Sequence, residues 1–171
     1  MKIAILSDTH DNLESLKRIL NFLKEKNVEK MIHCGDITTP ETLNFIRKSF
    51  KGEIFISLGN ADLKDKILAL RENLSGVFIF ENFGEIEIDE LKIGFSHFQN
   101  PSIDFEKYDF YFFGDTHRPF LKKIKNCYLA NPGNSANLYF QLTFAILDTK
   151  TKKIELVLVN PAPFVLSQKI F

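Results

Sequence analysis

The sequence contains no tryptophan and only two cysteines, Cys34 and Cys127, which lie far apart and form no CxxC pair. This spacing supports neither a disulfide framework nor a zinc ribbon. The formal net charge is zero, with 22 basic and 22 acidic residues, so no overall field steers the chain toward a polyanion. We therefore expect no general nucleic-acid binding.

A long apolar run is also absent, since no stretch approaches the length of a membrane-spanning helix. The first apolar run follows Met1 directly, which leaves no room for a secretory signal peptide. No linker, repeat or low-complexity segment divides the 171 residues. These absences predict one domain over residues 1–171, without a membrane partner and located in the cytoplasm.

The first half of the chain alternates apolar runs with helical patterns. The predicted strands cover residues 3–6, 30–34 and 53–58, and the predicted helices cover about 11–26, 38–50 and 64–73. Asp11, with Glu14 three positions later, has the form of an N-cap and capping box for the first helix. Alternation at these spacings indicates right-handed crossovers and a parallel sheet in an α/β fold.

From Val77 onward the pattern changes to short β-type runs joined by turn residues. These runs cover residues 77–80, 85–88, 92–96, 110–113, 121–125, 128–131, 140–147 and 154–159, with a predicted hairpin turn at 148–153. We expect them to build a second sheet that packs face to face on the first, with helices outside. The apolar stretch 161–166 is expected to pack on the body of the protein or on a neighbouring subunit, and a homodimer would follow from the second arrangement.

Metal-competent side chains directly follow five of the apolar runs. In chain order they are Asp8-x-His10, Gly35-Asp36, Gly59-Asn60, the lone His97, and Gly114-Asp115-Thr116-His117. In α/β sheets, ligands bind beyond the carboxyl ends of the strands. The five signatures are therefore expected to meet in one site.

The order of these motifs resembles that of the calcineurin-like metallophosphoesterase superfamily, which has D-x-H, GD, GN, a lone H and GHxH. The chain length and the Asn131-Pro132-Gly133 segment after a late strand are similar to the small bacterial and archaeal phosphodiesterase branch. The resemblance extends from residue 2 to about residue 160. It implies a four-layer αββα sandwich, in which two mixed β-sheets are flanked by helices.

By this resemblance the protein binds two divalent metal ions, which clamp a phosphoryl group and share a hydroxide that attacks phosphorus in line. Asp36 matches the carboxylate that bridges the two ions. The other matches are Asp8, His10 and His117 at the first ion, and Asn60, His97 and Asp115 at the second. Asp36, Asn60 and His97 are also expected to take part in catalysis.

Asp115 departs from the family pattern, which has histidine at this position. A carboxylate adds a negative charge and a hard oxygen ligand, and oxygen-rich sites suit manganese or magnesium better than zinc. Mn²⁺ is therefore favoured, with Ni²⁺, Mg²⁺ and Zn²⁺ as alternatives. The other interpretation is that the second site is weak or empty.

Two further departures concern the surroundings of the metals. Ala61 stands where many relatives have a histidine that protonates the leaving oxygen, and Phe98 stands where the family usually has glycine. Loss of general-acid help should affect poor leaving groups most. The Phe98 ring is expected to narrow the pocket or to shield one side of the metals.

Four further residues near the motifs have expected roles outside the ligand set. Arg118 either binds a substrate phosphate by forked hydrogen bonds or is a solvated surface residue. His33 is expected to be buried in the second strand or to orient Asp36 rather than to bind metal directly. Asn131 and Gly133 are expected to shape a turn near the site.

The leading hypothesis for function is a metal-dependent phosphoesterase, in particular a phosphodiesterase acting on a small phosphodiester or nucleotide-like substrate. One alternative keeps the enzyme but makes it a phosphomonoesterase or nucleotide hydrolase. The other is a non-catalytic scaffold, because the retromer scaffold subunit has this fold with a degraded metal site. Ala61, Phe98 and Asp115 favour the scaffold, whereas Asp8, His10, Asp36, Asn60 and His117 speak against it.

Overall fold

Seven strands form the larger of two sheets in the computed structural model, which describes residues 1–100, 102–159 and 163–166. The strand order is β12-β11-β10-β1-β2-β3-β4. Their bounds are β1 (Lys2–Leu6), β2 (Lys30–His33), β3 (Glu53–Ser57), β4 (Val77–Phe80), β10 (Thr143–Asp148), β11 (Lys153–Val159) and β12 (Pro163–Leu166). The first three strands pair in parallel, as the strand–helix alternation predicted.

The expectation that all runs from Val77 onward build the second sheet is wrong for β4, β10 and β11, which join the large sheet. There β4 pairs in parallel with β3, and β10 to β12 extend the sheet antiparallel. Hydrophobic periodicity shows which faces of a strand are buried, but not which strand is its neighbour.

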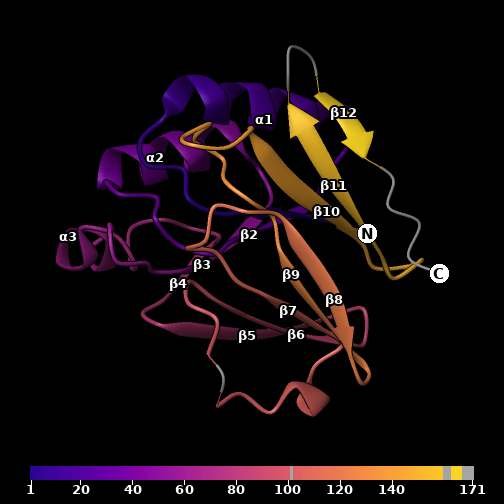
Figure 1. Ribbon diagram of the computed structural model, residues 1–171. Coiled ribbons are helices and arrows are strands. Elements are labelled where there is room, and N and C mark those ends of the chain that lie inside the picture. Colours follow the sequence, from indigo (N-terminus) through magenta and orange to yellow (C-terminus); the bar gives the residue numbers. More distant parts are fainter. Residues whose placement is uncertain (101, 160–162, 167–171) are drawn as a thin grey trace.

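The crossovers between the parallel strands contain the helices α1 (Leu13–Glu25), α2 (Pro40–Ser49) and α3 (Lys64–Leu68). They cover one face of the large sheet (Figure 1). A buried apolar cluster joins them to the strands and includes Leu16, Leu23, Ile46 and Phe144. None of the helices within the described part of the chain is both long and apolar enough to cross a membrane.

Five strands form the second sheet, in the order β5-β6-β7-β9-β8. They are β5 (Phe83–Ile88), β6 (Leu91–Ser96), β7 (Phe110–Phe112), β8 (Phe120–Ile124) and β9 (Cys127–Asn131). The central strand β7 pairs in parallel with β6 and β9, and the outer pairs are antiparallel, so this sheet is also mixed.

The two sheets pack against each other across a second apolar cluster, which includes Ile3, Ile5, Phe95, Phe110 and Phe112. The prediction of two mixed sheets with flanking helices is thus confirmed. The outer layer over the second sheet is thin. Within the described residues it contains a single 3₁₀ turn, η1 (Phe105–Lys107), which lies below that sheet in Figure 1.

The N-cap prediction for the first helix is wrong by one residue. Asn12 is the cap, since its side-chain oxygen accepts a hydrogen bond from the Ser15 N–H at 3.0 Å. The Asp11 carboxylate instead accepts hydrogen bonds from the hydroxyls of Thr39 and Thr42, at 2.7 and 2.5 Å. Asp11 therefore links the start of α1 to the start of α2.

Two predicted boundaries differ from the structure by three residues or more. Helix α3 ends at Leu68 rather than near residue 73, because the following segment closes tighter turns, such as Leu70 N–H to the Ile67 carbonyl at 3.0 Å. Strand β10 begins at Thr143 rather than at residue 140, because residues before it form a loop. The hairpin turn at 148–153 is confirmed.

The apolar C-terminal stretch is described only in part. Residues 163–166 form β12, which pairs antiparallel with β11 at the edge of the large sheet. Residues 161 and 162, which belong to the same predicted stretch, lie outside the described residues.

Candidate metal centre

The predicted ligands follow the carboxyl ends of strands from both sheets. They come after β1 (Asp8 and His10), β2 (Asp36), β3 (Asn60), β6 (His97) and β7 (Asp115 and His117). Backbone hydrogen bonds connect these loops, including Asp8 N–H to the Gly35 carbonyl at 3.0 Å and Gly114 N–H to the His97 carbonyl at 2.9 Å. The fold therefore brings side chains that are distant in sequence to one place.

Several of these residues have a left-handed backbone. The φ angles are +55° at Asp8, +43° at His10, +57° at Asp36, +65° at Asp115 and +57° at His117. Asp and His tolerate this region better than most residues, but each instance still costs free energy, about 1 kcal/mol or more. Such clustering of strained residues is typical of a functional site.

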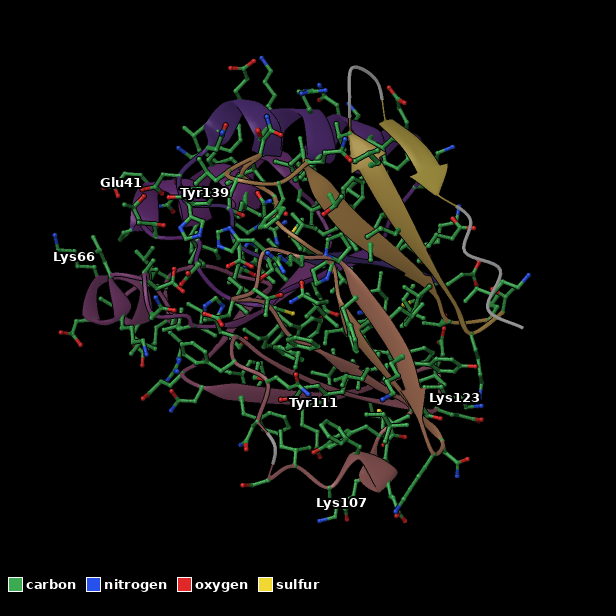
Figure 2. All side chains as sticks on the ribbon, viewed as in Figure 1. Glu41, Lys66, Lys107, Tyr111, Lys123 and Tyr139 are labelled. Carbon is green, nitrogen blue, oxygen red and sulfur yellow. The ribbon has the colours of Figure 1, made fainter. Side chains whose placement is uncertain are left out.

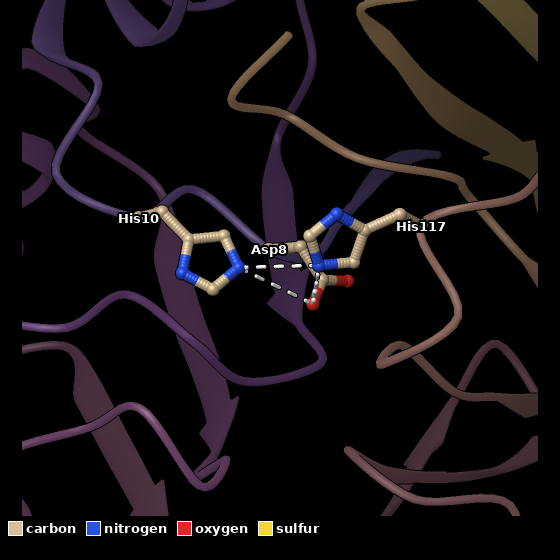
Figure 3. Close-up of side chains that lie close together, drawn as sticks. All are labelled: Asp8, His10 and His117. Carbon is tan, nitrogen blue, oxygen red and sulfur yellow. Dashed lines mark hydrogen bonds and ion pairs between the residues drawn. The ribbon is translucent and has the colours of Figure 1, made fainter. Parts of the chain in front are cut away.

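Asp8, His10 and His117 form the first group of donor atoms (Figure 3). His117 Nε2 lies 3.3 Å and His10 Nε2 lies 3.8 Å from Asp8 Oδ1. The two Nε2 atoms are 3.2 Å apart. This spacing places two nitrogen donors and a carboxylate around a common point.

Asp36 and His97 form the second group together with Asp8. His97 Nε2 lies 3.4 Å from Asp36 Oδ2 and 3.0 Å from Asn60 Oδ1. The same Asp36 oxygen is 3.7 Å from His10 Nε2. Asp36 Oδ2 therefore stands between the two groups.

The tautomer of His97 directs a lone pair toward this second group. His97 Nδ1 lies 2.8 Å from the Cys34 carbonyl, which can only accept, so Nδ1 carries the proton. In the neutral ring Nε2 then has a lone pair that faces the oxygen of Asn60. Two acceptors at this distance repel each other unless a proton or a cation lies between them, so the arrangement suits a metal ion.

Asp8 gives the clearest indication that a cation belongs here. Its side chain is fully buried, and neither carboxylate oxygen has a hydrogen-bond partner within the described residues. Burial raises the pKa of Asp8 to about 6, an effect that the nearby Ser7 hydroxyl and His97 reduce only in part. A buried anion without donors is costly, and a divalent cation would remove that cost.

The pKa values of Asp36 and His97 shift in the directions expected of a charged pair. Burial would raise the pKa of Asp36, but the hydrogen bond and attraction to His97 hold it below its usual value. Burial would lower the pKa of His97, but Asp36 outweighs it and raises the pKa to about 8. In the metal-free protein, Asp36 and His97 therefore stabilise each other's charged forms.

Asp115 lies at the solvent side of the second group. Its Oδ1 is 3.8 Å from His97 Nε2, and its side chain is 46% exposed. Phe98 packs its ring edge-on against the His97 imidazole, with centroids 4.8 Å apart. The Phe98 ring therefore contacts one side of the His97 imidazole.

Arg118, His33 and Asn131, which the sequence analysis also named, lie around the donor groups. Arg118 is exposed and its guanidinium lies over the Phe140 ring, 4.9 Å from the centroid. His33 is buried, and its Nε2 is 2.7 Å from the Thr9 hydroxyl, so it borders the site without facing the donor atoms. Burial lowers the pKa of His33 to about 3. Asn131 donates to the Gly114 carbonyl at 2.6 Å and so shapes the loop that carries His117.

Sequence reasoning missed Asp62, which is buried and organises two of the loops. Its Oδ2 accepts hydrogen bonds from the N–H groups of Asp36 and Gly59 at 3.0 and 2.7 Å, and its Oδ1 accepts from Thr38 at 2.6 Å. The only signal was an acidic residue two positions after Asn60, which has no ligand meaning by itself.

Two glycines of the motifs are required by close packing. A Cβ atom on Gly59 would lie 2.1 Å from Asp36 Oδ1, and one on Gly114 would lie 2.0 Å from the Ser7 hydroxyl. Any larger residue would therefore displace the metal-facing side chain or its loop.

A two-sheet sandwich with carboxylate and imidazole donors gathered at its strand ends is typical of metal-dependent phosphoesterases. The chain belongs to the calcineurin-like phosphoesterase superfamily, since the family's domain matches residues 1–152.

A phosphodiesterase of Methanocaldococcus jannaschii is 31% identical over 163 residues, which are 90% of this chain and 96% of the relative. A solved archaeal phosphodiesterase has a TM-score of 0.84 and 28% identity, and the match covers 93% of this chain and all of that chain. Two further solved structures are similar at the level of fold. A phosphoesterase from E. coli has a TM-score of 0.70 and 17% identity, and the match covers 98% of this chain and 97% of that chain. Vps29 from Entamoeba histolytica has a TM-score of 0.71 and 18% identity, and the match covers 96% of this chain and 97% of that chain.

The variant Asp8→Asn tests whether the buried carboxylate exists for a cation. Removing the charge should stabilise the metal-free protein by about 1–3 kcal/mol, because the desolvation cost of the anion disappears. The same variant should lose the rise in melting temperature that added metal gives the native protein. Thermal unfolding with and without Mn²⁺ measures both. A metal-free variant less stable than the native protein would show that Asp8 has another role.

The variant Asp62→Ala tests the linking role of this carboxylate. It leaves three N–H groups, two of them buried, without an acceptor, so the free energy of unfolding should fall by about 2–4 kcal/mol. Metal affinity should fall as well, since Asp36 is no longer fixed. Chemical denaturation and calorimetric metal titration measure the two effects, and Asp65→Ala on exposed α3 is the matched control. If metal affinity stays at the native level, Asp62 does not position Asp36.

Proposed function

We propose that the protein is a metal-dependent phosphodiesterase that hydrolyses a small phosphodiester at a site for two divalent ions. The position of the Asp36 carboxylate carries the proposal, because one oxygen lies within 3.7 Å of donor nitrogens in both groups. Two ions about 3.5–4 Å apart need such a shared carboxylate. When bound, the ions would supply Lewis-acid polarisation of the phosphate and a water of lowered pKa.

The chain's own residues would divide the remaining work. Asp8, His10 and His117 would hold the first ion, and His97, Asn60 and Asp115 would hold the second. Arg118 would bind a phosphate oxygen from the rim, since a guanidinium stacked on Phe140 keeps its N–H edge free to donate. The relative from Methanocaldococcus jannaschii, named a phosphodiesterase, supports a diester rather than a monoester substrate.

The Asp115 carboxylate makes Mn²⁺ the favoured ion, because it increases the number of hard oxygen donors at the rim. We further propose that the protein acts in the cytoplasm. We also propose that two subunits can pair through the apolar stretch 161–166.

The decisive experiment is hydrolysis of an aryl phosphodiester by metal-stripped protein after Mn²⁺, Mg²⁺, Ni²⁺ or Zn²⁺ is added back. Activity should return, most strongly with Mn²⁺, and Asp36→Asn should reduce it at least 100-fold, as about 3 kcal/mol of lost stabilisation implies. An aryl phosphomonoester assayed alongside separates a diesterase from a monoesterase. Asp115→His should move the preference toward Zn²⁺.

Two outcomes would contradict this proposal. Turnover of the monoester alone would make the protein a phosphomonoesterase. No turnover with any ion, together with less than one ion bound per chain, would indicate a scaffold instead. Strong preference of the native protein for Zn²⁺ would overturn the manganese assignment alone.

The environment of Ala61 leads to a prediction about the leaving group. Its backbone N–H donates to Asp36 Oδ1 at 2.8 Å, but its methyl side chain cannot protonate a leaving oxygen. General-acid help is worth about 10²–10⁴-fold. Diesters with an activated aryl leaving group should therefore be hydrolysed far faster than dialkyl esters, and Ala61→His should narrow the gap. Equal rates for aryl and alkyl leaving groups would show that another residue supplies the proton.

A further inference from the structure

An aromatic side chain lies exposed beside the metal centre. Tyr139 stands on the loop between β9 and β10 and is 90% exposed (Figure 2). Its ring centroid is 6.2 Å from that of His117, with the planes at 44°. Because the ring buries so little area, it contributes little to the stability of the fold. Its place next to a predicted metal ligand calls for a different explanation.

The loop holds Tyr139 in a strained conformation. Its φ is +63°, which is unusual for a bulky residue. The buried Asn134 fixes the loop, since its side-chain oxygen accepts from the N–H groups of Ala136 and Leu138 at 3.2 and 3.1 Å, and its amide donates to the Phe140 carbonyl at 3.3 Å. Backbone strain at a residue whose ring is almost fully exposed is more typical of function than of stability.

A groove of mixed character begins at Tyr139. Its volume is about 710 Å³, and its lining combines Tyr139 and apolar side chains such as Pro119, Phe140 and Leu158 with the polar Asn137, Gln141 and Thr143. Pro119 comes only two residues after His117, so the groove begins at the edge of the metal centre. The volume is within the range of small-molecule sites, about 300–1,000 Å³.

Arg118 supplies a cation beside the groove. Arg118 stands between His117 and Pro119 in the chain, and its guanidinium stacks on Phe140. A phosphate bound to the metals would therefore have a forked donor on one side and aromatic surfaces beyond it. Metal donors, a guanidinium and aromatic rings together fit an anionic ligand that carries a planar apolar group.

We propose that Tyr139 determines specificity by stacking on a planar aromatic group, an aryl ring or a nucleobase, that the substrate carries on its phosphate. The metal donors and Arg118 hold the phosphate, and the aromatic group lies against the Tyr139 ring at the mouth of the groove. The proposal deepens the phosphodiesterase function and rests on it. It concerns a small substrate, in keeping with a chain of zero net charge.

The first test measures binding rather than turnover. Calorimetry on Mn²⁺-loaded protein compares phenyl phosphate with methyl phosphate, which differ only in the planar group. Phenyl phosphate should bind about 5- to 100-fold more tightly, the range expected for stacking on one aromatic side chain. Tyr139→Asn should abolish this preference, and Tyr139→Phe should preserve it. Asparagine is chosen because it tolerates the left-handed backbone, and thermal unfolding checks that the fold is intact.

Equal binding of the two phosphates, or a preference that survives in Tyr139→Asn, would overturn the proposal. If the protein hydrolyses no ester but prefers phenyl phosphate in a Tyr139-dependent way, the stacking site stands and the phosphodiesterase function fails. The two ideas can therefore fail separately.

A second test distinguishes an aryl ring from a nucleobase. Three diesters share a p-nitrophenyl leaving group and carry methyl, phenyl or thymidine on the other arm. A kcat/KM advantage of thymidine over phenyl, lost in Tyr139→Asn, would assign the site to a nucleobase, and equal advantages would assign it to any planar ring. A uniform fall for all three esters would show that Tyr139 stacks on the leaving group. No change for any ester would overturn the proposal.

Discussion

The structure depends on two carboxylates, Asp8 and Asp36, that the fold buries together where five strands end. Asp8 is fully buried and has no hydrogen-bond donor within the described residues, and burial raises its pKa to about 6. Placing a second carboxylate, Asp36, in the same place is unfavourable unless something neutralises the charge. His97 does so in part, with its pKa raised to about 8 by Asp36. The remaining imbalance is what a divalent ion would remove, so the fold and the metal site cannot be understood separately.

Buried groups outside the donor set maintain this unfavourable arrangement. Asp62 ties the loops after β2 and β3 together by three backbone N–H groups, and Asn131 holds the loop after β7 by the Gly114 carbonyl. Gly59 and Gly114 allow the loops to approach more closely than any side chain would permit. These contacts hold the backbone of the loops and do not require a bound ion. They therefore stabilise the site in the metal-free protein. They explain how residues with positive φ are held in place without help from regular secondary structure.

Hydrophobic periodicity was enough to predict most of the strands and the parallel order of the first three, because burial on one or both faces determines each pattern. It could not assign β4, β10 and β11 to the large sheet, since a burial pattern does not identify the neighbouring strand. The spacing of Asp8, His10, Asp36 and His97 relative to strand ends was enough to predict that they meet. What the sequence could not predict depends on hydrogen bonds between distant segments. Asp11 was predicted to be a helix cap, but its carboxylate accepts hydrogen bonds from Thr39 and Thr42. These threonines are 28 and 31 residues away, so the local sequence does not show the contacts. Asp62 escaped notice for a similar reason, since two of its three partners, Asp36 and Thr38, belong to the loop after β2.

The three departures from the family pattern lie at the edge of the donor set, and this bears on whether the site is functional. Asp115 is half exposed, Phe98 contacts His97 from one side, and Ala61 still supplies the backbone N–H that binds Asp36. None of them disturbs the convergence of Asp8 and His117. In a scaffold that never binds metal, a fully buried carboxylate without donors would only destabilise the fold, and an amide or an apolar residue would serve better. The energetic cost of the buried Asp8 carboxylate is therefore more consistent with a site that binds metal than with one that no longer does. The three departures then modify the edge of the site and leave the central donors in place.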